Sequence, residues 1–285
     1  MISQISSLLK LRIGVIMTFT ALAAMIVTPG RQPGSFGIIV LAFAILASAG
    51  SAGAFNQYFE VDLDRRMPRT QNRPFVTGRF KKSPLWLLFI AVLLIAGVGS
   101  SALVLNGVAA LYIFLGAFFY AIVYTVWLKR RTWLNIVIGG AAGSFAVLAG
   151  AAAVDPVMSP VPILLALVLF FWTPSHFWSL AIAKQQDYAD AGVPMLPVIV
   201  GNERAAVAVM GNTVILVGIS ILPFFYGLGW LYLTASLTGG GYFIYRNYQM
   251  ILDPSPKIAM KSFLASLLQL VVLLSGAVLD ALLLG

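Results

Sequence analysis

Residues 84–127 decide the fold class, and they read PLWLLFIAVLLIAGVGSSALVLNGVAALYIFLGAFFYAIVYTVW. The stretch contains no charged residue, and only Asn106-Gly107 interrupts its apolar pattern. An apolar run of about 20 residues spans the hydrocarbon core of a bilayer as a helix. The stretch therefore predicts two membrane spans joined by a very short turn.

The rest of the chain has the same character. Of its 285 residues, 60% are hydrophobic and 9% are charged, and the mean hydropathy is +0.96. A soluble domain carries charge on about 25% of its residues, so we expect an all-α polytopic membrane protein with one domain over residues 1–285. Cysteine is absent, which excludes disulfides and thiolate metal sites. The nine expected spans are 11–28, 36–55, 84–105, 107–127, 133–154, 161–183, 205–225, 227–246 and 262–284.

The cations predict the orientation of these spans. If the loops are assigned alternately to the two sides, all 18 lysines and arginines except Arg31 fall on one side. Positive charge is retained on the cytoplasmic side, so we expect a cytoplasmic N-terminus and Gly285 outside. The first apolar run lacks a convincing small-residue cleavage site, which favours a retained helix over a cleaved signal peptide.

Carboxylates gather in two segments on the cation-rich side. If the second span continues as a helix, Asn56, Glu60 and Asp64 share one face at intervals of about 6 Å. Three oxygen ligands of this kind favour Mg²⁺ shared with a diphosphate. Asp62 points about 200° away from Glu60, so we expect it to pair with a nearby arginine. The acidic residues of the two segments are Glu60, Asp62, Asp64, Asp187 and Asp190.

The cations near the first segment allow two interpretations. They are the charges that hold cytoplasmic loops inside, or a subset of them binds diphosphate through bidentate guanidinium groups and compact ammonium groups. Arg73, between Asn72 and Pro74, is the preferred member of such a subset.

The second segment also leaves alternatives open. Lys184, Asp187 and Asp190 are spaced i, i+3, i+6, which predicts one helical face that either shares a ligand with the first segment or is a solvated surface. His176 is the only histidine and lies roughly 12 Å below Lys184 by helical rise. It is either a hydrogen-bonded packing residue or a ligand to metal or substrate.

Three ordered runs resemble the UbiA superfamily of intramembrane prenyltransferases, and within it the protoheme IX farnesyltransferase subfamily. The superfamily pattern Asn-x-x-x-Asp-x-x-x-Asp maps onto Asn56, Glu60 and Asp64. This sequence departs from it in having Glu60 for aspartate and Gln57 where many members carry another acid, and Asp190 falls at a variable position. The runs are MPRTQNRP at 67–74, YTVWLKRRTWLNIVIGG at 124–140 and DYADAGVPMLP at 187–197.

The resemblance implies nine helices around a central cavity, with farnesyl diphosphate held on Mg²⁺ between the two acidic helix ends. The farnesyl group would pass to a vinyl group of haem B, giving haem O and diphosphate. The implied catalytic and metal-binding residues are Asn56, Glu60, Asp64 and Asp187. The implied substrate-binding residues are Arg69, Arg73, Lys129, Arg130, Asn135, His176, Lys184 and Tyr188.

The same resemblance implies a bacterial or archaeal cell membrane with the active-site loops in the cytoplasm. The expected partners are the lipid bilayer and haem A synthase or terminal oxidase assembly factors, with no nucleic acid. Two alternatives remain open. One is a related prenyltransferase acting on an aromatic quinone precursor, and the other is a proton- or ion-coupled transporter, for which acids near the bilayer midplane would be expected.

Overall fold

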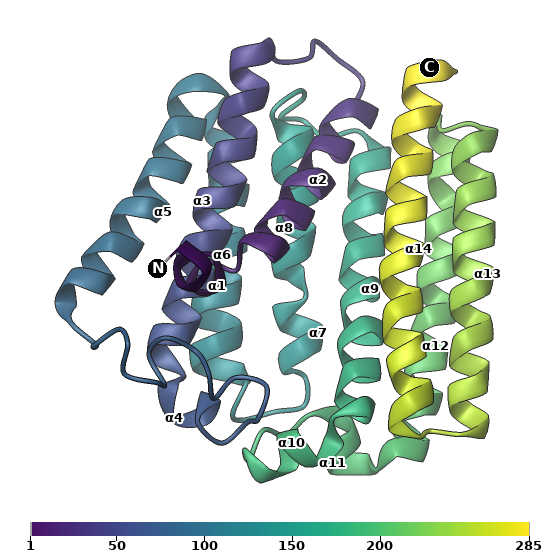
Figure 1. Cartoon of the computed structure of the whole chain (residues 1–285). Coiled ribbons are helices and arrows are strands. Elements are labelled where there is room, and N and C mark those ends of the chain that lie inside the picture. Colours follow the sequence, from purple (N-terminus) through teal and green to yellow (C-terminus); the bar gives the residue numbers. More distant parts are fainter. Residues whose placement is uncertain (1, 285) are drawn as a thin grey trace.

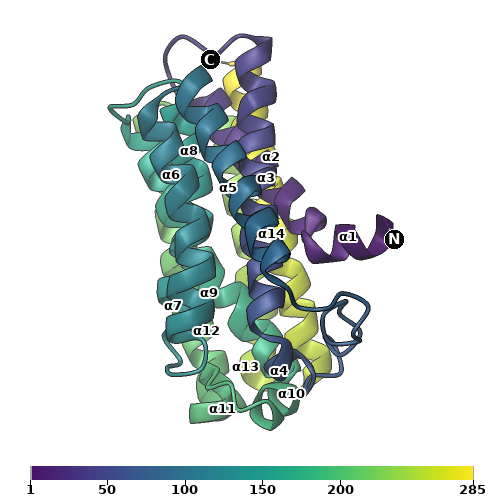
Figure 2. The same cartoon turned by 90° about the vertical axis from the view of Figure 1, so that its left-hand side faces the viewer.

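The structure is a computed structural model that describes residues 2–284, and no strand occurs among them. Its long helices run side by side along one direction, whereas α1 (Ile2–Leu8) lies across them (Figures 1 and 2). The expectation of an all-α protein is therefore confirmed. The long helices are α2 (Leu11–Val27), α3 (Ser35–Phe59), α5 (Pro84–Val104), α6 (Gly107–Phe118), α8 (Ala141–Ala152), α9 (Pro160–Ala183), α12 (Asn202–Ile221), α13 (Trp230–Leu252) and α14 (Pro256–Leu283).

Shorter helical pieces extend or connect these helices. The π-helix η1 (Phe119–Leu128) continues α6, α7 (Asn135–Gly139) precedes α8, and the 3₁₀-helix η2 (Leu222–Tyr226) follows α12. Three more helices, α4 (Val61–Asp64), α10 (Gln185–Asp190) and α11 (Leu196–Val200), lie together at one end of the bundle, which we call the charged end (Figure 1).

Seven helical segments among the described residues are long and apolar enough to cross a membrane. They match seven of the nine predicted spans. The predicted spans 11–28 and 227–246 fall on α2, which has 17 residues, and on α13, which is not among the seven. The span count of nine and the cytoplasmic N-terminus remain predictions, and Gly285 lies outside the described residues.

Local sequence explains where several helices begin. Proline occupies the first turn of α5, α9 and α14, where its missing N–H costs no hydrogen bond. Asn106 caps α6, because its Oδ1 accepts from the backbone N–H of Ala109 at 2.8 Å. Gly227, at φ 117°, supplies the left-handed turn before α13. The predicted turns at Asn106-Gly107 and at 226–229 are confirmed.

Two expected helices are less regular than predicted. The span 133–154 is interrupted at Gly140, between α7 and α8. There the backbone packs against α9, because a Cβ on Gly140 would lie 2.9 Å from the Thr173 side chain. The span 107–127 changes from α-helix to π-helix at Phe119, next to the candidate site described below.

Two groups of helices make up the bundle. On one side α9, α12, α13 and α14 pack together, and on the other α2 packs on α3 and α8, with α5 outermost (Figure 1). Contacts of α2 with α14 and of α8 with α9 join the groups. The approach of α2 to α8 is very close, since a Cβ on Gly150 would overlap the carbonyl oxygen of Ala21.

A buried carboxylate holds the last two helices together. Asp280 of α14 is 3% exposed, and its side chain accepts hydrogen bonds from the backbone N–H groups of Gly229, Leu231 and Tyr232 at the start of α13. An anion at the positive end of a helix dipole caps it favourably. Asp280 is therefore a structural residue, far from the charged end.

Candidate active site

The first acidic segment lies where α3 ends and α4 begins. The structure corrects the prediction of one continuous helix through Asn56, Glu60 and Asp64, because Glu60 separates α3 from α4. The backbone still carries bonds from Glu60 N to Asn56 O at 3.0 Å and from Asp64 N to Glu60 O at 2.8 Å. All three side chains are consequently buried at the charged end, as a shared face would require.

Each of these side chains is bonded to a cation from another part of the chain, namely Lys10, Arg73 or Lys129. We call the three side chains and their three cations the ion-pair cluster. Arg73 is the preferred diphosphate ligand of the sequence analysis, and Lys129 is among the substrate-binding residues that the family resemblance implies. The bonds are Lys129 Nζ to Glu60 Oε2 at 2.5 Å, Arg73 Nη1 to Asp64 Oδ2 at 2.6 Å and Lys10 Nζ to Asn56 Oδ1 at 2.8 Å.

Lys10 is the site residue that the sequence did not reveal. It lies between α1 and α2 with φ 48°, an uncommon conformation for a lysine, and its ammonium group also donates to the Tyr120 hydroxyl at 2.6 Å. Burial, and next the positive charge of Arg73, lower the pKa of Lys10 from its ordinary value to about 7. Its apolar neighbours in the sequence do not distinguish it from Arg12, which lies between Leu11 and Ile13.

The π-helix η1 forms one wall beside the cluster. Its wider turn carries Tyr120 and Tyr124, whose rings stack with centroids 5.6 Å apart, and Lys129 lies 5.6 Å from the Tyr124 ring. Thr125 accepts from Asn56 Nδ2 at 3.1 Å and donates to the Tyr120 carbonyl at 2.8 Å. π-Helical turns are frequent at functional sites, and this ten-residue segment places two rings next to the cations of the cluster.

Arg69 connects the cluster to the second acidic segment. Its Nη2 donates to the Tyr188 hydroxyl of α10 at 3.2 Å, and its guanidinium lies 5.7 Å from that ring. The charge of Asp187 also acts on Arg69. The structure thus brings Arg69, Tyr188 and Asp187 to the same region as the first segment.

The helical face predicted for Lys184, Asp187 and Asp190 is wrong in one respect. Helix α9 ends at Ala183, and Lys184 has an irregular backbone before α10 begins. Lys184 and Asp187 line a depression of about 240 Å³ with Pro256 and the start of α12. Asp190 is exposed and accepts from Gln186 Nε2 at 2.7 Å, so it is a surface residue.

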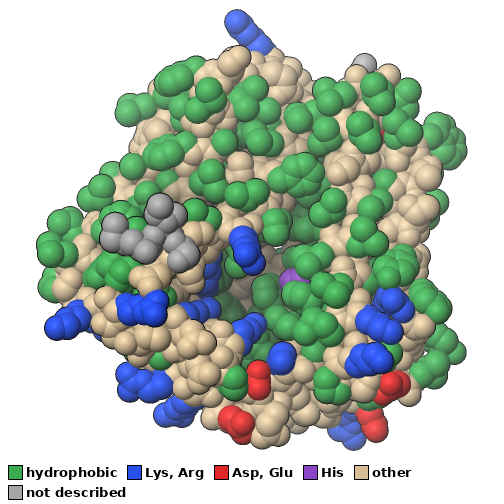
Figure 3. All heavy atoms as spheres, in the orientation of Figure 1, with side chains coloured by type: hydrophobic (Ala, Val, Ile, Leu, Met, Phe, Trp, Pro, Cys, Tyr) green, Lys and Arg blue, Asp and Glu red, His purple; other side chains and the backbone are tan. Residues whose placement is uncertain are grey.

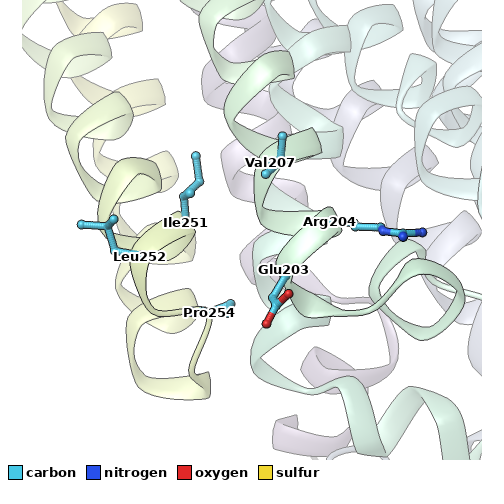
Figure 4. A pocket seen from close by; sticks show the side chains of 6 residues that line it. All are labelled: Glu203, Arg204, Val207, Ile251, Leu252 and Pro254. Atoms are coloured by element: carbon cyan, nitrogen blue, oxygen red, sulfur yellow. The ribbon is translucent and has the colours of Figure 1, made fainter.

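A second depression lies at the start of α12 and the end of α13. Figure 4 shows its lining, with Glu203, Arg204 and Val207 on one side and Ile251, Leu252 and Pro254 on the other; its volume is about 280 Å³. Neither depression is lined by a member of the ion-pair cluster.

Asp62 and Arg130 pair with each other outside the cluster. Arg130 donates twice to the Asp62 carboxylate, at 2.7 and 2.8 Å, which confirms that Asp62 turns toward an arginine. These hydrogen bonds lower the pKa of Asp62 to about 2. Arg130, predicted as a substrate ligand, is thereby engaged on an exposed surface.

Several buried polar atoms near the cluster have no hydrogen-bond partner. They include Glu60 Oε1, Asn135 Oδ1 and the indole N–H of Trp178. Asn135 itself is held by a bond from its Nδ2 to the Thr132 carbonyl at 2.6 Å. Buried groups of this kind are normally satisfied, so they suit a polar ligand or ordered water.

The donor set can be compared with the expected metal. Within residues 2–284, no three His, Cys, Asp or Glu side chains are close enough together to hold an ion by themselves. The oxygen donors Asn56, Glu60 and Asp64, one with an unpartnered oxygen, nevertheless fit Mg²⁺, which keeps several waters and binds through one or two carboxylates plus phosphate. The residues present fit a metal that shares its coordination with a diphosphate.

His176 lies in a separate aromatic stack between α9 and α14. Its ring is sandwiched by Trp172 and Phe263 at centroid distances of 4.2 and 4.3 Å, and its Nδ1 lies 2.6 Å from Ser266 Oγ. The single hydrogen of that hydroxyl is donated to the Phe263 carbonyl. In this arrangement Nδ1 donates the ring proton to Ser266 Oγ and Nε2 keeps its lone pair, whereas in the other tautomer the hydroxyl donates to Nδ1.

The space-filling view shows how these parts relate to the surface. A hollow opens on the face of the bundle in Figure 3, with lysine and arginine side chains along its lower and left rim. The purple side chain of the single histidine lies at its opposite side. His176, although only 6% exposed, is thus reached from this hollow.

Comparison with known proteins gives the family and the fold. A model of the UbiA prenyltransferase family matches residues 17–271. "Protoheme IX farnesyltransferase 2" of Paramagnetospirillum magneticum is 52% identical over 281 residues, which cover 99% of this chain and 98% of that protein.

Solved structures agree on the fold. Digeranylgeranylglyceryl phosphate synthase superposes with a TM-score of 0.81 at 19% identity over 98% of both chains. A UbiA homologue from Archaeoglobus fulgidus, solved with DMAPP and Mg²⁺, superposes with a TM-score of 0.70 at 19% identity over 95% of this chain and 99% of that one.

Proposed function

The chain belongs to the UbiA prenyltransferase family and is a prenyltransferase, and from this premise we propose that it transfers farnesyl from farnesyl diphosphate to a vinyl group of haem B. The products are haem O and diphosphate. The observation that carries the proposal is the ion-pair cluster, which gathers buried carboxylates and cations at one end of an apolar helix bundle. One face of that bundle is hollowed, with cations along part of the rim (Figure 3). Family membership replaces the transporter interpretation.

The proposed metal is Mg²⁺, which Asn56, Glu60 and Asp64 would hold. Asp187 of the second segment, also expected as a ligand, is not close enough to Glu60 and Asp64 in this structure to complete a three-acid site. The metal would neutralise the negative charge that builds up on the diphosphate as it leaves. The homologue from Archaeoglobus fulgidus, which shares this fold and was solved with DMAPP and Mg²⁺, is consistent with this proposal. The unpartnered Oε1 of Glu60 supports the same assignment in this chain.

The chain's own cations bind and stabilise the leaving group. Lys10, Lys129 and Arg73 donate hydrogen bonds to the diphosphate as the bond between it and farnesyl C1 breaks. Tyr120 and Tyr124 present stacked ring faces beside the cluster, which suits them to shield the allylic cation. The apolar interior of the bundle keeps water from the cation until the acceptor has reacted.

The acceptor reacts through its π electrons. A new bond joins farnesyl C1 to the outer vinyl carbon of haem, and the positive charge moves to the carbon beside the porphyrin. Water adds there as a hydroxyl group and releases one proton, which balances the reaction. We assign His176 to the haem end of the hollow, because its Nε2 lone pair can ligate iron or accept a hydrogen bond.

The remaining parts of the proposal concern location and partners. The loops of the charged end face the cytoplasm of a bacterial or archaeal cell, since they carry nearly all of the cations. Haem A synthase or a terminal oxidase assembly factor would receive the product.

Alanine at Glu60 or at Asp64 tests the metal-diphosphate site. Either substitution should reduce farnesyl transfer by at least ~100-fold, because the metal that stabilises the negative charge on the leaving diphosphate loses a ligand. Membrane insertion should be unchanged, since it depends on lysine and arginine. The assay supplies farnesyl diphosphate with haem B or with a phenolic quinone precursor to purified protein. Asp62→Ala is the matched control and should stay near wild type. Full activity of both cluster variants would reject the site, and product from the phenol alone would reject haem as the acceptor.

A further inference from the structure

We propose that Lys10, Lys129 and Arg73 make the ion-pair cluster selective for a divalent metal that arrives with a diphosphate, and that they exclude the free metal ion. The inference rests on the proposed function, since it concerns the metal site of that reaction. In this inference the cations act before catalysis: they decide whether the free metal ion or its diphosphate complex binds.

The first support is that the proposed ligand atoms are already occupied. One oxygen of each metal-binding side chain of the first segment accepts a hydrogen bond from a cation, at 2.5 to 2.8 Å. The three cations come from three separate places, before α2, after α4 and after η1. A metal ion that binds these oxygens must first displace ammonium or guanidinium groups.

The second support is burial. The Glu60 and Asp64 side chains are 0% and 2% exposed, and those of Lys129 and Arg73 are 12% and 22% exposed. Charges in such a site interact more strongly than charges in water, and removing one partner of a buried pair leaves a costly unpaired charge. A displaced cation therefore needs a new anion close by.

The third support is the charge count. The carboxylates of Glu60 and Asp64 are balanced by Arg73 and Lys129, so the protonated Lys10 ammonium is a positive charge in excess. Arg69 and Asp187 add opposite charges nearby. Free Mg²⁺ would add two more positive charges. A prenyl diphosphate carries about three negative charges, so its Mg²⁺ complex carries about one and neutralises the excess. The displaced cations then donate to the diphosphate oxygens, and metal and diphosphate bind cooperatively.

Metal titrations of purified protein in detergent test this coupling without any turnover. The probe is Mn²⁺, with free ion measured by electron paramagnetic resonance, in the presence and absence of inorganic diphosphate. For the wild type we expect diphosphate to tighten Mn²⁺ binding by at least ~10-fold, and Mn²⁺ to tighten diphosphate binding by the same factor. Blanks without protein correct for the complex formed in solution.

Variants identify the residues responsible. Lys129→Met should bind Mn²⁺ alone at least ~10-fold more tightly than the wild type, with a smaller gain from diphosphate. The Glu60 carboxylate then accepts only from the neutral Asn56 amide, at 2.8 Å, and one positive charge is gone. Lys10→Met should change both quantities in the same direction and serves as a second test if Lys129→Met does not fold. Arg131→Met removes an exposed charge from the same loop and should behave as the wild type.

The outcomes separate the inference from the proposed function. If the wild type binds Mn²⁺ equally well without diphosphate, or if neither lysine variant gains affinity for Mn²⁺ alone, the inference is wrong while the metal site stands. If no Mn²⁺ binds even with diphosphate, or if Glu60→Gln binds it as the wild type does, the metal assignment itself is wrong and the inference falls with it.

Discussion

Replacing His176 by phenylalanine separates the packing role of this side chain from its proposed contact with haem. Phenylalanine keeps a flat ring between Trp172 and Phe263 but has neither ring nitrogen. Alanine removes both the ring and the nitrogens. The two variants should therefore differ in stability and agree in their effect on haem.

The magnitudes follow from the contacts. His176→Phe loses the Nδ1 hydrogen bond, worth about 1 kcal/mol, and leaves Ser266 still bonded to the Phe263 carbonyl. His176→Ala also loses two aromatic stacks and leaves a cavity, which costs roughly 3–5 kcal/mol for a buried ring. If Nε2 contacts haem, both variants should weaken haem binding by at least ~10-fold.

Two measurements on each purified variant decide between these roles. Thermal unfolding in detergent gives the order of stability, and separate titrations give the affinities for haem and for farnesyl diphosphate. We expect the phenylalanine variant to be nearly as stable as the wild type, to bind farnesyl diphosphate normally and to bind haem poorly. A stable phenylalanine variant with wild-type haem affinity would refute the assignment and leave His176 with a packing role alone.

Three further predictions concern the surface pair, the helix packing and the orientation. The hydrogen bonds from Arg130 depress the pKa of Asp62 in the folded state, so the stability that this pair contributes is present above about pH 4 and is lost as pH falls toward 2. Asp62→Ala should abolish that part of the pH dependence of thermal unfolding at a cost of only ~0.5 kcal/mol at neutral pH, since the pair is exposed. Gly150→Ala should destabilise the fold by about 3 kcal/mol through its clash with Ala21, whereas Gly143→Ala in the same helix meets open space and should not; equal unfolding temperatures would contradict the packing. Reporter fusions after Gly285 should lie outside, and a cytoplasmic reporter there would contradict the count of nine spans. The loops expected in the cytoplasm are those around Arg69, Arg130, Gly192 and Asp253.

Local features of this chain could be predicted from its sequence because the relevant spacing lies within a few residues. Asp62 turns away from Glu60 by simple helical rotation, and its arginine partner followed from that geometry. The turns at Asn106-Gly107 and at 226–229 carry residues that end helices. The acids at the ends of α3 and α9 were visible because so few acidic residues exist.

Other features depend on contacts between distant segments, and these the sequence could not provide. Lys10 bonds to residues 46 and 110 positions away, and in sequence its charge had a sufficient explanation as a topology signal. The breaks at Glu60 and Lys184 contain neither glycine nor proline, so helical periodicity ran through both. The change to a π-helix at Phe119 likewise follows no local residue pattern that we can name.

The cap that Asp280 places on α13 also has a consequence for biosynthesis. The ribosome completes α13 well before Asp280, because the capping bonds join residues 48 to 51 positions apart. Until then the first backbone N–H groups of α13 lack this acceptor, in a helix that is less apolar than seven others of the described chain. Helices α13 and α14 therefore mature as one hairpin, and the cap on α13 forms only after Asp280 has been translated.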